Sequence, residues 1–148
     1  MKKNNKTGFT LIELLVVIAI IGLLSTLSIL ALNTARARSR DARRVADIKQ
    51  IQTALEMYYN DASAYPEDAS MAPGLRLSFG SSTYIAAIPK PPTPTNDGDC
   101  PSITVVADNE YTYALGTGKS TYTIRYCIGS PVNDLAAGFH TANPAGIW

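Results

Sequence analysis

The chain opens with a long apolar stretch that predicts a membrane-spanning helix. Nineteen residues from Leu14 to Leu32 carry no charge, and the 24 residues from Phe9 to Leu32 carry one, on Glu13. A bilayer core takes about 20 apolar residues in a helix, and lipid offers the backbone no hydrogen-bond partners other than its own. A carboxylate inside such a span costs roughly 2.5–3.5 kcal/mol. Glu13 is therefore expected to have a partner for its charge.

Beyond the span, the apolar residues recur at helical spacing. No proline occurs between Leu32 and Pro66, so the helix is expected to continue to about Asn60 and to stop before Tyr65 and Pro66. One stripe of this second half is apolar, which predicts an amphipathic helix that needs a partner surface: Val45, Ile48, Ile51, Leu55 and Tyr58.

The last third of the chain changes to the alternating pattern of β-strands. Three runs carry it, Ile103–Ala107, Tyr111–Leu115 and Thr121–Ile128, and the five-residue loop Gly116–Ser120 joins the last two as a hairpin. Tyrosines and isoleucines share one face, which predicts a small antiparallel sheet covered by the amphipathic helix. The fold class is therefore α+β.

Two further segments are expected to lack regular structure. Pro66–Pro101 is loop-like and contains an extended proline-rich connector, Pro89–Pro94. The tail Gly129–Trp148 is expected to be irregular, with its aromatic residues against an edge of the sheet.

Length and charge limit the classes of function. With 148 residues, 13 basic and 12 acidic side chains, the chain suits one domain with one anchor, and its balance does not indicate a specific nucleic-acid partner. A secretory signal peptide fits poorly, because the apolar run exceeds the roughly 7–15 residues of such signals. Five arginines follow the span, and their position favours lipid headgroups over DNA: Arg36, Arg38, Arg40, Arg43 and Arg44.

Motifs for catalysis or cofactor binding are weak. Gly116–Ser120 resembles the end of a phosphate-binding loop, but Tyr113 occupies the position of its first glycine and the loop joins two strands. His140 is the only histidine, so a surface residue is favoured over a metal ligand. We expect no enzymatic activity, no catalytic residue and no cofactor. Five loop carboxylates leave calcium as an alternative to plain solvated turns: Asp97, Asp99, Asp108, Glu110 and Asp134.

Cys100 and Cys127 are the only cysteines and predict a disulfide, because a domain beyond the span would lie where disulfides persist. Closing this loop would contribute roughly 3–4 kcal/mol. A plain three-strand meander would place the two cysteines at opposite ends of the sheet. Either the bridge is absent or Ile103–Ala107 is placed otherwise, and we favour the bridge.

The N-terminal motif resembles the prepilin signal of type IV pilins and type II secretion pseudopilins. A lysine-rich leader ends at Gly8, Phe9-Thr10-Leu11-Ile12-Glu13 follows, and the apolar helix completes a match over roughly the first 35 residues. Arg40–Asp61, followed by Tyr65-Pro66, is similar to the major pseudopilin group. The Asp-Pro-Trp segment common in that group has no counterpart at Ile88–Pro92, so the resemblance does not extend to that group's calcium site.

The resemblance implies processing and assembly. A prepilin peptidase would cleave between Gly8 and Phe9 and methylate the new Phe9 amine, and Glu13 would pair with the Phe9 amine of a neighbouring subunit. The implied partners are identical and related pilin subunits in a helical polymer, the membrane and the assembly machinery of the inner membrane. The chain would cross the cytoplasmic membrane once before assembly and lie in an extracytoplasmic or cell-surface filament afterwards.

Together these patterns predict four segments: a leader over 1–8, a transmembrane helix over 9–32, an amphipathic stem over 33–62 and an extracytoplasmic domain over 63–148. The expected function is that of a structural filament subunit. The alternative is a single-pass membrane protein that carries a binding or sensing domain and does not polymerise. Such a protein needs no cleavage at Gly8.

Overall fold

A computed structural model describes residues 8–95, 98, 100 and 111–148. Its first element is the helix α1 (Leu11–Ala62), which includes both the apolar stretch and the amphipathic stripe. The helix ends at Ala62, and the positive φ of 54° at Ser63 turns the chain; the Ser63 N–H donates to the Tyr59 carbonyl at 2.7 Å. The expected helix and its end near Asn60 are confirmed.

The chain divides into two compact units. One unit ends at Arg36, and the other runs from Ala37 to Trp148. The second unit therefore includes the amphipathic part of α1, because that part buries its apolar stripe within the unit whereas residues 11–36 are exposed. The boundary between the exposed part and the packed part of α1 thus lies after Arg36, a few residues beyond Leu32, the last residue of the predicted span.

A four-stranded antiparallel sheet forms one layer of the second unit. Its strands follow one another in chain order, so each is paired with the next through a short connection: β3 (Thr112–Leu115), β4 (Tyr122–Ile128), β5 (Gly138–Asn143) and β6 (Gly146–Ile147). The α+β class and the hairpin of the two tyrosine-rich strands are confirmed. The expectation of an irregular tail is wrong, because β5 and β6 lie in it, whereas the predicted strand Ile103–Ala107 lies outside the described residues.

A second small sheet lies in the segment expected to be a loop. A 3₁₀ turn, η1 (Asp68–Met71), is followed by the hairpin of β1 (Leu77–Phe79) and β2 (Ser82–Ile85). The two-residue connection Gly80-Ser81 has glycine at φ 58°, which favours a tight hairpin. Tyr58 of α1 contacts the rings of Phe79 and Tyr84, so the hairpin packs on the helix.

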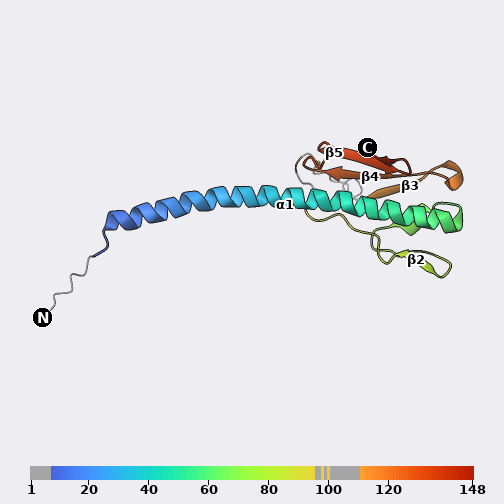
Figure 1. Cartoon of the computed structure of the whole chain (residues 1–148), viewed down its shortest axis with the longest axis horizontal. Coiled ribbons are helices and arrows are strands. Elements are labelled where there is room, and N and C mark those ends of the chain that lie inside the picture. Colours follow the sequence, from blue (N-terminus) through green and yellow to red (C-terminus); the bar gives the residue numbers. More distant parts are fainter. Residues whose placement is uncertain (1–7, 96–97, 99, 101–110) are drawn as a thin grey trace. The chain divides into compact units, whose positions relative to one another are not determined.

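The core lies between the amphipathic part of α1 and the inner face of the four-stranded sheet. Within the second unit, the helix has this sheet on one side and the β1–β2 hairpin on another (Figure 1). Ile48, Leu55 and Ile128 are fully buried. The alternation predicted for β4 is confirmed, since Tyr122, Ile124 and Tyr126 are buried. A further 3₁₀ turn, η2 (Thr117–Lys119), lies in the β3–β4 loop.

Candidate functional site

The N-terminal end of α1 carries a capping box built from Thr10 and Glu13. The Thr10 N–H and hydroxyl both donate to Glu13 Oε2, at 2.8 and 2.6 Å, and the Glu13 N–H points to the Thr10 hydroxyl at 3.3 Å. These contacts satisfy backbone donors that a helix otherwise leaves unpaired at its start. Both donors use the same carboxylate oxygen, so within the described residues Oε1 remains available to a further donor. Gly8 and Phe9 directly precede this box.

The side chains of the apolar part of α1 are exposed along its whole length. Phe9 is 79% exposed and Leu11 is 87% exposed, and all residues from Leu11 to Arg36 are exposed. By length and composition α1 is able to cross a membrane. Four hydroxyl side chains along it, Ser25, Thr26, Ser28 and Thr34, donate to carbonyls three or four residues earlier, so these hydroxyls are satisfied within the helix.

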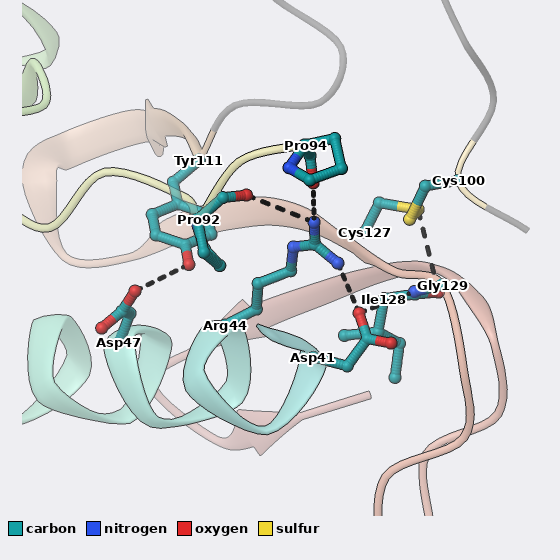
Figure 2. A network of polar contacts seen from close by, with 10 residues as sticks. All are labelled: Asp41, Arg44, Asp47, Pro92, Pro94, Cys100, Tyr111, Cys127, Ile128 and Gly129. Carbon is teal, nitrogen blue, oxygen red and sulfur yellow. Dashed lines mark hydrogen bonds and ion pairs between the residues drawn. A yellow bond between two sulfur atoms is a disulfide. The ribbon is translucent and has the colours of Figure 1, made fainter. Parts of the chain in front are cut away.

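A buried ion pair ties the start of the second unit to two distant segments (Figure 2). Arg44 is 1% exposed and is paired with Asp41, which is fully buried. The Arg44 guanidinium also donates to the Pro94 carbonyl at 2.8 Å, and the Gly129 N–H donates to Asp41 Oδ1 at 2.9 Å. The pair therefore joins α1 to the proline-rich connector and to the end of β4.

Asp47, one turn further along α1 than Arg44, binds Tyr111, the residue directly before β3. The Tyr111 hydroxyl donates to Asp47 Oδ2 at 2.9 Å in a buried contact (Figure 2). Burial raises the pKa of Asp47, and the hydrogen bond from Tyr111 and the charge of Arg43 partly oppose that rise. Burial together with the nearby Asp47 charge raises the pKa of Tyr111. The phenol stays neutral and acts as the donor.

A disulfide joins Cys100 to Cys127 in the structure, beside this network (Figure 2). Both residues are buried, and Cys127 lies near the end of β4. Cys100 follows the proline-rich connector in the sequence. Arg44 therefore holds the connector at Pro94, and the disulfide holds the chain a few residues later, at Cys100. The sequence indicated that, if this disulfide forms, Ile103–Ala107 is not placed as a plain three-strand meander would place it. Those residues lie outside the described part of the chain.

The arginines after the span do not act as one group. Arg36, Arg38 and Arg43 are exposed, whereas Arg44 is buried in the ion pair with Asp41. The interpretation of all five as ligands for lipid headgroups is therefore wrong for Arg44. The sequence held a signal for this difference, because positions 41, 44, 48, 51 and 55 share one helical face and only the first two are charged.

The remaining candidate residues have structural contacts. Lys119, in the phosphate-loop-like segment, forms an exposed ion pair with Glu67. Both ring nitrogens of His140 face backbone carbonyls, Nδ1 that of Trp148 at 2.9 Å and Nε2 that of Ala136 at 2.7 Å. Asp134 is exposed, and the other carboxylates considered for calcium lie outside the described residues. No group of three potential metal ligands occurs among the residues that the structure describes.

Comparison with known proteins agrees with this N-terminal segment. A family model described as the prokaryotic N-terminal methylation motif matches residues 3–29. The type II secretion system core protein G of Aeromonas hydrophila is 34% identical over 102 residues, which cover 62% of this chain and 71% of the relative. The protein of the same name from Escherichia coli K12 is 32% identical over 98 residues, covering 60% and 68%. No solved structure gives a significant match.

A methylation motif at the start of a long helix, which packs its second part on an antiparallel sheet, defines a pilin-like protein. The extent of the two alignments allows a narrower assignment. The chain belongs to the family of the type II secretion system core protein G, the major pseudopilins.

Proposed function

We propose that this chain is a structural subunit of a pseudopilus-type filament, assembled through its N-terminal helix after cleavage between Gly8 and Phe9. The observation that carries the proposal is the capping box at the start of an exposed apolar helix. It holds the Glu13 carboxylate next to Phe9 with Oε1 available. The new amine that cleavage creates on Phe9 of a neighbouring subunit is a donor of the charge and size that this oxygen accepts.

The chemistry of this pairing favours a repeated contact between copies. A carboxylate and an ammonium group in an apolar surrounding attract each other strongly and are costly when left alone. Each subunit would carry one of each group near the same end of the helix, so the contact is heterologous and propagates along a filament. The pair would fix the axial register, while the exposed apolar residues of α1 supply the packing between helices.

Processing is tested by the mass of the mature protein. We expect the chain, expressed together with a prepilin peptidase, to begin at Phe9 and to carry one added methyl group on its amine. An intact Met1, or a cut at another position, would contradict the proposal and favour the single-pass binding or sensing protein.

Assembly is tested by replacing Glu13 with glutamine, which keeps the shape of the side chain and removes its charge. We expect Glu13→Gln to be cleaved and to remain in the membrane fraction, but to yield at least about tenfold less sheared filament, as the loss of one charged hydrogen bond would give. Thr10→Ser, which keeps the capping hydroxyl, is the matched control and should assemble normally. Normal filament yield from Glu13→Gln would overturn the register argument.

A further inference from the structure

The outer face of the four-stranded sheet carries a cross-strand row that the proposed function does not use. Thr112 of β3 is opposite Arg125 of β4, and Arg125 is opposite Thr141 of β5. Thr141 exchanges two backbone hydrogen bonds with Trp148, at 2.8 and 3.0 Å. Neighbouring strands lie about 4.8 Å apart, so the row from Thr112 to Trp148 spans about 14 Å.

Two aromatic side chains stand exposed on this face. Trp148 is 64% exposed, and Phe139, two residues before Thr141 and therefore on the same face, is 44% exposed. The Arg125 guanidinium lies 5.7 Å from the centre of the Phe139 ring. The backbone of Trp148 is held at this edge, since its carbonyl oxygen accepts from the Thr141 N–H and faces a ring nitrogen of His140.

The charge on this face is of one sign. Arg125 is the only charged residue that the described strands place on the outer face, and no carboxylate of the described residues pairs with it. Thr123 and Thr141 flank Arg125 with hydroxyl groups, and Asn143 continues the polar surface along β5. No leucine, isoleucine, valine or methionine of these strands lies on this face.

We propose that this face, defined by Arg125, Phe139, Thr141 and Trp148, binds a polysaccharide that carries carboxylate groups. Aromatic rings present flat apolar surfaces with a negative face, and the C–H faces of sugar rings stack on such surfaces. A guanidinium binds a carboxylate through two parallel hydrogen bonds, and threonine hydroxyls donate to and accept from sugar hydroxyls.

The composition favours a sugar polymer over a protein partner. Protein interfaces are also enriched in arginine and aromatic residues, but they place these residues around an apolar buried centre, and specific interfaces bury more than about 1,000 Å². This face has instead a charged centre, hydroxyl-bearing neighbours and two isolated aromatic rings. An acidic polymer supplies a carboxylate that complements the charge of Arg125.

The protein contains one tryptophan, so the fluorescence of Trp148 reports directly on this face. The probe is polygalacturonate, titrated into the full-length protein in detergent, with excitation at wavelengths that tyrosine does not absorb. Methyl-esterified polygalacturonan has the same sugar rings without the charge and is the matched ligand control. We expect a saturable change in fluorescence with polygalacturonate and binding at least about tenfold weaker with the ester.

Two arginine variants separate this face from general attraction to a polyanion. Arg125→Gln should weaken binding at least about tenfold, whereas Arg76→Gln, which removes an exposed charge before β1, should leave it unchanged. Equal loss in both variants, equal binding of the methyl ester, or no change in fluorescence would overturn the proposal. A change that follows protein concentration without polysaccharide would identify a contact between copies and would also overturn it.

Discussion

At the scale of single residues, two buried tyrosines differ in whether their hydroxyl has a partner. The Tyr111 hydroxyl donates to Asp47, whereas that of Tyr126 is buried with no hydrogen-bond partner among the residues that the structure describes, and burial raises the pKa of Tyr126 to about 12. We expect Tyr126→Phe to leave the free energy of unfolding unchanged or to raise it by up to about 1 kcal/mol. Tyr111→Phe should lower it by about 1–3 kcal/mol, because Asp47 loses its donor.

Denaturant unfolding of both tyrosine variants, with the disulfide intact, measures this difference. Both substitutions remove one buried phenol oxygen, so each serves as the control for the other. A larger loss of stability for Tyr126→Phe than for Tyr111→Phe would contradict the assignment of partners.

Asp47 predicts a dependence of stability on pH. Its pKa in the folded protein is raised above the ordinary value of 3.8, so the folded state binds the proton more tightly than the unfolded state. The contribution of Asp47 to stability is therefore full below that value and is lost as the pH rises through the raised pKa. Asp47→Asn keeps an acceptor for Tyr111 and removes the titration.

We expect the Asp47→Asn variant to be at least as stable as the parent protein near neutral pH. The difference in free energy of unfolding between the two proteins should shrink as the pH falls towards about 4. Chemical denaturation at several pH values measures it. A difference that grows on acidification would show that ionised Asp47 stabilises the fold.

At the scale of elements, the ion pair of Arg44 and Asp41 decides how α1 holds the connector. Arg44→Gln leaves the Asp41 carboxylate buried without its charge partner, and such a loss costs about 3–5 kcal/mol. Arg43→Gln, at the adjacent exposed position, is expected to cost less than about 0.5 kcal/mol. Adding Asp41→Asn to Arg44→Gln should recover part of the loss, since it removes the unpaired charge. Denaturant unfolding followed by circular dichroism distinguishes these outcomes.

The elements that the sequence predicted well are those with strong periodicity. The stripe from Val45 to Leu55 repeats every three or four residues over several turns, and β4 alternates between buried and exposed residues from Tyr122 to Tyr126. The β1–β2 hairpin was missed because three- and four-residue strands rich in serine bury few side chains. Its connection Gly80-Ser81 nevertheless has a composition typical of tight hairpins.

The candidate site was predicted unevenly for a similar reason. Gly8, Phe9 and Glu13 belong to a contiguous motif, so sequence spacing alone identifies them. The contacts of Arg44 with Pro92 and Pro94 join residues 48 and 50 positions apart, and no local pattern indicates such a pair. The sequence indicated only that Arg44 is a charged residue on the apolar face of the stem and therefore needs a buried partner.

At the scale of the whole molecule, the disulfide closes a long loop across the second unit. Its cysteines are separated by 27 residues, for which the chain-entropy model gives roughly 3–4 kcal/mol. We expect the double variant Cys100→Ser, Cys127→Ser to lose about that much stability. Parent protein treated with reductant should unfold at the same denaturant concentration as the variant. Equal stability of oxidised parent and variant would show that the polar network alone holds the connector.

The ion pair in the stem also has a consequence for the order of folding. Asp41 accepts a hydrogen bond from the Gly129 N–H, 88 positions later in the chain. During synthesis, Arg44 and Asp41 therefore emerge long before the backbone groups that complete their burial. The stem passes through a period in which its apolar stripe and charges are open to water, and contacts of such separation form slowly. The polar contacts of Asp41 cannot be completed until synthesis has passed Gly129, so the second unit folds late relative to the synthesis of its own helix.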